Sequence, residues 1–409
     1  MNAPDLDLLL RTGTLRLVDE LGAIRTTDEA TAALLRLRKD GIAPELAATA
    51  LTQARLRTRA VAKFGEFAAR MLFTEEGLQQ ATRLGVAARH ADRYRDAGLS
   101  RVADLGCGIG GDALAFAGLG LAVRAIDRDP VAAAIAAYNL AAFPDASVAV
   151  GAAEDVDLAG VDAVWLDPAR RGLPRGSTPD SRRPARLDPA DWSPSLDFAF
   201  GLADRLPTGV KLGPGLDHEL LPRDREAQWV SDGGEVVELV VWSGALARPG
   251  VGRAALVIGA GGAAELTAAG DSEDVAAGEL GEYLVEPDGA VIRARLIGDL
   301  ARSLDPAARM LHETIAWVTL DTEPRTPFGQ SFRVLDVLPL DTKAVRRALL
   351  ARDAGAAEIK KRGVDIEPAE FRRRLKLPGG GRQLTVILTR LGARRRAILA
   401  ERVPPGRAE

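Results

Sequence analysis

The chain has 409 residues, of which 47% are apolar and 27% charged, and its formal net charge is −3. This length predicts two or three domains, and this composition is that of soluble globular proteins. No apolar run reaches the roughly 18 residues of a membrane span, so none is expected. The N-terminus has no basic leader or cleavage site, and the single cysteine, Cys107, forms no internal disulfide. We therefore expect a cytoplasmic protein, and with three histidines beside one cysteine we expect no Cys/His metal site.

Charge is unevenly distributed along the chain. Residues 341–409 hold 18 Lys+Arg against 8 Asp+Glu, a balance of +10, so the remainder carries −13. A basic end on an acidic body favours a polyanionic partner such as a nucleic acid. A solvated basic surface, or an arginine-rich genome, is the alternative.

The first 97 residues have helical character throughout and are predicted to form an N-terminal helical domain. Apolar residues recur at helical spacing in 8–18 and 30–37, and further helices are expected over 44–69 and 78–97. Thr74 precedes two glutamates and is expected to begin a helix.

A glycine-rich turn lies at the centre of the next domain, residues 98–262. A strand at 101–105 is followed by Gly106, Gly108, Gly110 and Gly111, then by a helix at 112–119 and a strand at 122–126 that ends at Asp127. This is one unit of a doubly wound parallel sheet. The glycines allow a sharp turn and a ligand against the main chain, and Asp127 is placed to accept both hydroxyls of a ribose.

Two cofactors fit this turn. Gly106, Gly108 and Gly111 meet the G-x-G-x-x-G spacing of a dinucleotide site, with Asp127 as its acid. The same residues read D-x-G-x-G-x-G from Asp104 to Gly110, which resembles the first motif of class I S-adenosylmethionine (SAM) methyltransferases. A carboxylate such as Asp104 suits a cationic ligand. The glycines alone do not distinguish between these two cofactors. A glycine-rich turn that binds no ligand is the third alternative.

The rest of this domain alternates strands and helices. Strands are expected at 147–150, 161–166, 208–212, 235–242 and 253–259, and helices at 130–142 and 217–230. The last two strands are predicted to form a terminal antiparallel pair. Together with the first two strands they give seven, the number and order of the methyltransferase sheet.

Ligands in such sheets bind beyond the carboxyl ends of the strands, and acidic residues follow four consecutive strands. After Asp104 and Asp127, the third end carries Glu154 and Asp155, where an acid commonly meets the adenine amino group. The fourth end is Asp167-Pro168-Ala169-Arg170-Arg171, and Lys211 stands near the fifth.

The fourth end is expected to hold the substrate. It resembles the [D/N]-P-P-[Y/F/W] motif of N-methyltransferases, in which the acid and backbone carbonyls accept hydrogen bonds from the amine. Here Ala169 and Arg170 replace the second proline and the aromatic ring, so the arginines are expected to bind phosphate or to stack as guanidinium planes. The segment also resembles the D-P-P-R-x-G-L of uracil-C5 methyltransferases, but those need a cysteine after the fifth strand, and this chain has none there. The long polar stretch 172–194 is expected either to grip substrate or to be disordered.

Residues 263–409 are predicted to form a separate basic α/β domain. Strands are expected at 282–286 and 291–296 around a Pro287-Asp288-Gly289 hairpin turn, and then at 316–320, 332–338, 383–390 and 395–401. Helices are expected at 300–304, 342–354 and 368–375, and a short strand or turn at 358–362. The candidate nucleic-acid-binding residues here are Lys360, Lys361, Arg362, Arg372 and Arg373, which join Arg171 from the preceding domain.

Several segments together resemble one family. They are KFGEFAARMLFTEEGLQQAT (63–82), DLGCGIGGDALAFA (104–117), AIDRDP (125–130), WLDPARR (165–171), KLGPGLD (211–217) and EIKKRGVDIEPAEFRRRLKL (358–377). The chain is similar to bacterial class I SAM-dependent methyltransferases with a C-terminal THUMP-like domain. The resemblance implies a Rossmann-like seven-stranded α/β sheet, SAM as the cofactor and RNA, with tRNA one option, as the partner.

The resulting hypothesis is direct methyl transfer to a base nitrogen of RNA. SAM is expected on Asp104, Gly106, Gly108, Gly110 and Asp127, with its adenine near Glu154 or Asp155, and the catalytic residues are expected to be Asp167, Pro168 and Arg170. Two alternatives stay open: a methyltransferase of protein or a small molecule, and a non-catalytic protein that binds SAM and RNA.

Overall fold

The computed structural model describes residues 3–170 and 192–404, and the chain divides into two units. The first comprises Met1–Leu212 and Trp242–Ala247, and the second comprises Gly213–Val241 and Arg248–Glu409.

The first unit begins with helices whose ends follow local sequence signals. They are α1 (Ala3–Leu9), α2 (Thr12–Leu21), α3 (Thr27–Lys39), α4 (Pro44–Phe64), α5 (Glu75–Gln80) and α6 (Leu84–Asp96). Thr26 and Glu29 form a reciprocal capping box at α3, and Thr74 caps α5 as predicted, accepting from the backbone of Gly77. Helices are therefore confirmed where the sequence predicts them, but the continuous spans were wrong.

Three expected helices are interrupted. Helical structure over 8–18 is divided between α1 and α2, and the span 44–69 passes into a 3₁₀ helix at Gly65–Arg70. Gly65 has φ +54°, a left-handed conformation that ends α4. Helix α6 begins only at Leu84, so the span 78–97 is interrupted after α5.

The parallel sheet of the first unit has the strand order of a doubly wound fold. Within the described residues its strands are β1 (Arg101–Leu105), β2 (Ala122–Asp127), β3 (Ala146–Val150), β4 (Ala163–Leu166) and β7 (Thr208–Leu212). Their order is β7-β4-β1-β2-β3, and the pairs β4–β7, β1–β4, β1–β2 and β2–β3 are all parallel. The order reverses at β1, which is where such sheets bind ligands.

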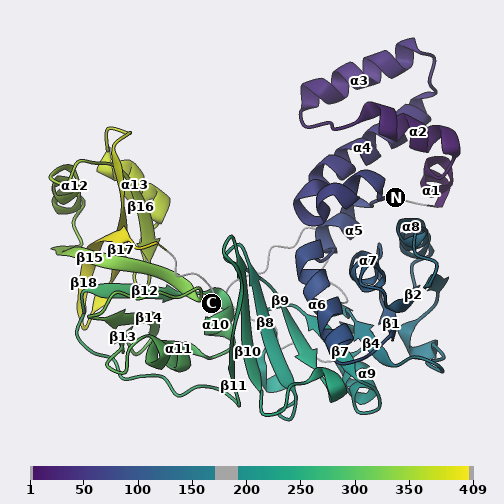
Figure 1. Cartoon of the computed structure of the whole chain (residues 1–409). Coiled ribbons are helices and arrows are strands. Elements are labelled where there is room, and N and C mark those ends of the chain that lie inside the picture. Colours follow the sequence, from purple (N-terminus) through teal and green to yellow (C-terminus); the bar gives the residue numbers. More distant parts are fainter. Residues whose placement is uncertain (1–2, 171–191, 405–409) are drawn as a thin grey trace. The chain divides into compact units, whose positions relative to one another are not determined.

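Helices complete this unit. Helices α7 (Gly111–Gly118) and α8 (Pro130–Leu140) pack beside β1 and β2, and α9 (Leu196–Ala203) packs on β7 (Figure 1). Tyr94 of α6 joins two strands, because its hydroxyl donates to the Val164 carbonyl and accepts from the Gly209 amide. The N-terminal helices and the parallel sheet thus share one core.

The second unit begins with four further strands. They are β8 (Glu226–Asp232), β9 (Glu235–Trp242, whose last residue is grouped with the first unit), β10 (Arg253–Gly259) and β11 (Gly262–Ala268), in the order β11-β10-β8-β9. The described residues of this α/β region therefore hold nine sheet strands, two more than the seven expected.

Two predictions fail here. The helix expected over 217–230 is a short 3₁₀ turn (His218–Leu220) followed by β8, whose residues pair in parallel with β10. Because β8 lies between β9 and β10, the expected antiparallel pair of 235–242 with 253–259 is also wrong, and β10 instead pairs antiparallel with β11.

The C-terminal part of the second unit is a mixed sheet. Its strands are β12 (Tyr283–Pro287), β13 (Arg309–His312), β14 (Ile315–Leu320), β15 (Gly329–Pro339), β16 (Ala354–Lys361), β17 (Arg382–Leu391) and β18 (Arg394–Arg402), in the order β13-β14-β12-β15-β18-β17-β16. The predicted final pair β17–β18 is confirmed as antiparallel. Helices α12 (Thr342–Leu350) and α13 (Pro368–Leu375) pack against each other and on β16 (Figure 1).

The hairpin predicted around Pro287-Asp288-Gly289 does not form. Asp288 instead accepts from the backbone of Ala290 and begins α10 (Gly289–Arg293), which is followed by α11 (Ile297–Leu304). An Asp before a glycine serves a helix cap as readily as a turn, so the local signal was ambiguous.

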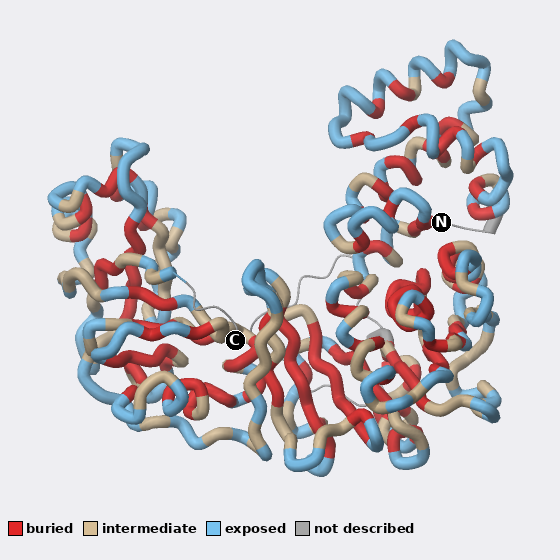
Figure 2. Tube along the Cα trace, viewed as in Figure 1, coloured by how far each residue is buried: buried red, intermediate tan, exposed pale blue. Residues whose placement is uncertain are grey.

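Burial follows these elements. Strand β8 is buried over nearly its whole length, whereas α3 buries only Ala30, Ala33 and Leu37, one face of the helix (Figure 2). Among the described helices, none has both the length and the apolar character that a membrane crossing requires.

Candidate cofactor and substrate site

The glycine turn after β1 has the backbone shape that its sequence predicts. Gly106, Gly108 and Gly110 have φ values of +94°, +54° and +82°, a region that side chains disfavour. The amides of Gly106 and Cys107 both donate to the Ile126 carbonyl, at 2.8 and 3.0 Å, which ties the turn to the end of β2. A Cβ on Gly106 would lie 3.4 Å from the Asp167 carbonyl oxygen, so the ends of β1 and β4 are in close contact.

Asp127, the last residue of β2, lies against this turn. Its Oδ2 accepts from the Gly108 amide at 2.8 Å, and its Oδ1 accepts from the Asp129 amide at 2.8 Å. The carboxylate is partly buried and fixed by two backbone donors. A fixed acceptor at this place suits the hydroxyl pair of a ribose.

Asp104 lies at the end of β1 and is 1% exposed. Its Oδ2 is buried and has no hydrogen-bond partner among the described residues. Burial, reinforced by the nearby charges of Asp112 and Asp167, raises the pKa of Asp104 well above its usual value. A buried carboxyl oxygen without a partner is an acceptor that a cationic or hydrogen-bonding ligand would satisfy.

Glu154 and Asp155 follow β3 in a short 3₁₀ turn, Ala153–Asp155, and both are exposed. Parallel pairing of β2 with β3 places this turn at the same sheet edge as Asp127. The structure therefore leaves these two carboxylates open to a ligand at that edge.

Five side chains from separate segments meet beside the turn. Lys211, at the end of β7, lies 2.6 Å from Asp167 and 3.6 Å from Asp112, and it donates to the hydroxyl of Thr82 at 2.8 Å. Asp112 also accepts from Thr82 at 2.8 Å and lies 3.1 Å from Nδ1 of His90. We call these residues the Lys211 cluster.

Charge balance in the Lys211 cluster favours an ionised Asp112. Burial raises the pKa of Asp112. The charge of Lys211 and the hydrogen bonds with His90 and Thr82 outweigh this effect of burial, so the net result is a pKa of Asp112 below its usual range. Lys211 is only 10% exposed, whereas the Asp167 side chain is 37% exposed and reaches solvent.

Sequence reasoning named Asp167 but missed Thr82, His90 and Asp112, and it left Lys211 without a role. One signal was present: Lys211 is the single charge in the buried strand Thr208–Leu212. A buried lysine requires anionic partners, but the sequence does not say which.

The remaining substrate candidates lie on the same chain segment as Asp167. Pro168 is buried directly after β4, and the backbone of Arg170 pairs with Trp192 in a two-stranded ladder of β5 (Ala169–Arg170) and β6 (Trp192–Ser193). The Arg170 side chain, Arg171 and the stretch 172–191 lie outside the described residues.

The segment before α5 also supports the glycine turn. Asn139 of α8 accepts from the Leu72 amide at 2.8 Å and donates to the carbonyls of Leu72 and Ile109, at 3.1 and 2.9 Å. Gly77 of α5 packs against the Ile109 side chain so closely that a Cβ there would clash. The N-terminal segment therefore helps to shape the turn.

Cys107 lies within the turn and is buried. Burial raises the pKa of its thiol far above the usual range, and the nearby charges of Asp104 and Asp127 add to this. A thiolate is therefore disfavoured at Cys107.

The basic candidates of the second unit differ in their surroundings. Lys360 pairs with Glu286 at 2.6 Å and with Glu358 at 3.5 Å, and Arg362 pairs with Glu286 at 2.9 Å. Lys361 is partly buried near the end of β16. Arg372 and Arg373 are exposed on α13. Lys360 and Arg362 already have carboxylate partners, whereas Arg372 and Arg373 form no ion pair with a described residue.

The first unit fits a SAM ligand. The left-handed glycine turn, the fixed Asp127 carboxylate and the unsatisfied Asp104 carboxyl group line one sheet edge at the switch point. The strand order β7-β4-β1-β2-β3, with these residues at the ends of β1 and β2, defines a class I SAM-dependent methyltransferase.

Comparison with known proteins gives the family. The chain is 36% identical over 381 residues to Rv3037c of Mycobacterium tuberculosis H37Rv, an uncharacterized SAM-dependent methyltransferase, covering 88% of this chain and 96% of the relative. The counterpart in strain CDC 1551, MT3122, has the same identity and coverage. The chain belongs to this family of SAM-dependent methyltransferases.

Further similarities concern parts of the chain and the fold. Residues 329–402 match the THUMP domain-like family, and residues 6–60 match a domain of unknown function, DUF8688. The crystal structure of a "putative methyltransferase" from Porphyromonas gingivalis W83 has a TM-score of 0.72 at 20% identity, covering 96% of this chain and 99% of that one. This confirms the expected α/β methyltransferase fold with N-terminal helices and a C-terminal THUMP-like mixed sheet.

Proposed function

We propose that this SAM-dependent methyltransferase transfers a methyl group directly to a base nitrogen of RNA, tRNA being one candidate. The observation that carries the proposal is the contact between the glycine turn and the substrate segment, where the Asp167 carbonyl lies against Gly106. A nucleophile held at Asp167 therefore lies next to a cofactor held on the turn.

When bound, SAM supplies an electrophilic methyl group on a sulfonium. Gly106, Gly108 and Asp127 hold the cofactor and fix its orientation. The Asp167 carboxylate and the backbone carbonyl of Pro168 accept hydrogen bonds from the N–H groups of the nucleophile. Positioning of this kind supplies much of the rate in such a reaction.

Lys211 defines what Asp167 does in this mechanism. An ammonium group at 2.6 Å favours the ionised carboxylate, which makes Asp167 a good hydrogen-bond acceptor and a weak base. Asp167 thus orients the nucleophile rather than removing its proton. The proton leaves to water after the methyl group has been transferred.

Two observations support RNA as the substrate class. Residues 341–409, which include most of the THUMP-like match, carry a balance of +10. Exposed Arg372 and Arg373 form no ion pair with a described residue, so they are available to phosphates.

The test is methyl transfer from radiolabelled SAM to total RNA, total protein and small-molecule extract from a strain that lacks the protein. We expect label in an RNA band, which is lost with Asp167→Ala and retained with Asp145→Ala. Asp145 is an exposed carboxylate directly before β3, at the amino ends of the parallel strands and away from the glycine turn. Label in protein or in a small molecule would overturn the RNA proposal. Calorimetric SAM binding with no label in any pool would leave the non-catalytic alternative.

A further inference from the structure

The strand ends that flank the β17–β18 turn carry four arginines, Arg390, Arg394, Arg395 and Arg396, and no acidic residue lies between them. In the antiparallel ladder Arg390 is directly opposite Arg395. Like charges opposite each other in a sheet repel and are destabilising. This pair therefore adds to the positive potential at this end of the two strands.

These arginines differ from several other basic residues of the same THUMP-like segment, which have carboxylate partners. Arg374, Arg382 and Arg402 all form ion pairs with glutamates. The four arginines that flank the turn form no ion pair with any described residue, and Nε of Arg390 is buried without a hydrogen-bond partner there. Their charge is therefore not balanced by described neighbours.

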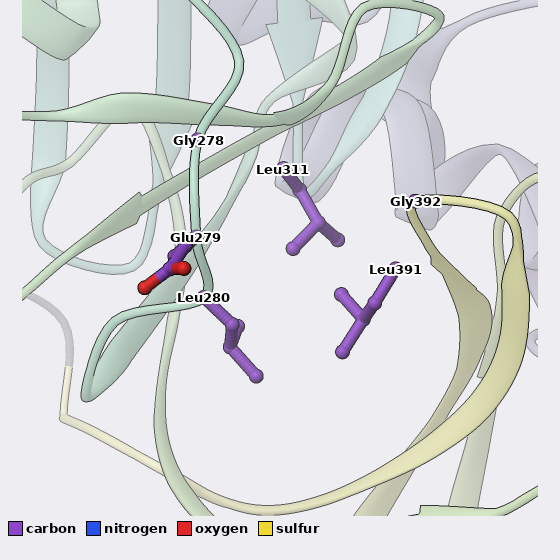
Figure 3. A pocket seen from close by; sticks show the side chains of 6 residues that line it. All are labelled: Gly278, Glu279, Leu280, Leu311, Leu391 and Gly392. Atoms are coloured by element: carbon purple, nitrogen blue, oxygen red, sulfur yellow. The ribbon is translucent and has the colours of Figure 1, made fainter.

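A pocket of about 400 Å³ adjoins this turn. Its lining consists of Gly278, Glu279, Leu280, Leu311, Leu391 and Gly392. In Figure 3 the three leucine side chains face a common space, and the Glu279 carboxylate points away from them. The pocket is thus largely apolar, and its volume falls within the roughly 300–1,000 Å³ of small-molecule sites.

The ladder register brings charge and pocket together. Leu391 lies directly opposite Arg394, and the alternation of side chains puts Arg394 and Arg396 on the face of the sheet that Leu391 shares. An apolar pocket beside unpaired arginines matches one unstacked base next to the phosphates of its strand. RNA-binding proteins combine positive charge along the backbone of a single strand with side chains that contact its unstacked bases.

We propose that the β17–β18 turn and this pocket bind an unpaired nucleotide of the RNA substrate, with its base against Leu280, Leu311 and Leu391 and its phosphates on Arg394 and Arg396. This rests on the proposed function, and it places a principal RNA contact on this turn rather than on Lys360 and Arg362.

The test measures binding of a short fluorescent single-stranded RNA to the full-length protein by anisotropy, over a range of salt concentrations. The variant R394A/R395A/R396A is compared with K343A/R346A/R347A, which removes the same charge from exposed positions of α12. We expect the first to weaken binding by about tenfold or more and to lower the salt slope by about two, and the second to change little.

Filling the pocket separates its role from that of charge. Leu280→Phe adds volume without changing charge, and we expect weaker binding with an unchanged salt slope, while the melting temperature reports intact folding. Equal losses in the two triple variants, no loss in the turn variant, or equal binding by Leu280→Phe would each overturn the proposal. Binding to vesicles of phosphatidylcholine and phosphatidylserine in preference to RNA would also overturn it.

Methyl transfer measured in parallel distinguishes the two proposals. If the unmodified protein labels RNA and the turn variant labels it with the same KM, the inference fails and the proposed function stands. If no protein labels RNA but the turn variant alone loses oligonucleotide binding, the proposed function fails and the binding site stands.

Discussion

The ammonium group of Lys211, at the end of β7, lies 2.6 Å from the carboxylate of Asp167, which follows β4. The same lysine lies 3.6 Å from the buried Asp112. One cation therefore fixes the segment after β4 and balances a buried acid beside the glycine turn. We expect it to affect both the positioning of a substrate and the stability of the protein.

Lys211→Met removes this cation and keeps much of the side-chain length. We expect kcat/KM for methyl transfer to fall by about tenfold or more, equivalent to about 1.4 kcal/mol, because Asp167 is no longer held. The melting temperature is expected to fall as well, since Asp112 loses its cation. In the double variant with Asp167→Asn, the second change should cost little activity. A Lys211→Met enzyme with lower stability but unchanged kcat/KM would assign the lysine a structural role alone.

Asp127→Ala removes the carboxylate that accepts hydrogen bonds from the Gly108 and Asp129 amides. We expect the affinity for SAM to fall by about tenfold or more, because a ribose loses its acceptor and the turn loses a tie to β2. Calorimetric titration with SAM measures the change, and Asp145→Ala is the matched control. Unaltered affinity would show that the ribose is not held at Asp127.

Gly106→Ala tests the closeness of the strand ends. The residue has φ +94°, and its Cβ would lie 3.4 Å from the Asp167 carbonyl oxygen. The backbone strain is expected to cost about 1–3 kcal/mol of folding free energy, and the altered turn should lower turnover. Gly118→Ala on α7, where a Cβ meets nothing within 4 Å, is the control and should be neutral or slightly stabilising. Denaturant unfolding and initial rates on both variants decide the point.

Asp104 gives the protein without ligand a distinct pH dependence. Its pKa is raised in the folded state, so it contributes stability at pH values below the usual carboxyl pKa of about 3.9, and this is lost as pH rises through the folded pKa. The Asp104→Asn variant does not lose stability in this way, because its amide does not titrate. We expect the variant's melting temperature to exceed that of the unmodified protein by a margin that grows as pH increases from about 4.

Saturating SAM should reduce that margin, because a ligand that also contacts the Asp104 carboxyl group stabilises the unmodified protein more than the variant. Thermal melts of both proteins across pH, with and without SAM, provide the measurement. A margin that shrinks as pH rises would contradict the expected sign.

Local patterns predicted the glycine turn after β1 and the strand that ends at Asp127. The run from Asp104 to Gly110 and the acid at Asp127 are close in sequence, and the left-handed glycines are a direct consequence of residue type. The order of β1 to β4 follows from the alternation of strands and helices, which permits few topologies.

Non-local pairing explains what the sequence did not show. Strand β8 exists because residues such as Trp229 pair with β10 and are buried, while the segment itself reads as helical or irregular. In the Lys211 cluster, Lys211 lies near Thr82, His90, Asp112 and Asp167, which belong to different helices, strands and loops. No spacing in the sequence predicts that these residues meet. Asp288 illustrates a different reason for a wrong prediction, because an Asp before a glycine fits both a hairpin turn and the start of a helix.

Asn139 gives the cofactor turn a remote reporter. One amide side chain holds both the Leu72 backbone and the carbonyl of Ile109, the residue before Gly110. The proton on the Leu72 amide therefore exchanges with deuterated water only when its hydrogen bond to Asn139 breaks. Because Asn139 also bonds to Ile109, we expect this to happen when the glycine turn opens. A cofactor seated on the glycines should slow deuterium uptake at Leu72, in a segment that the cofactor itself need not touch.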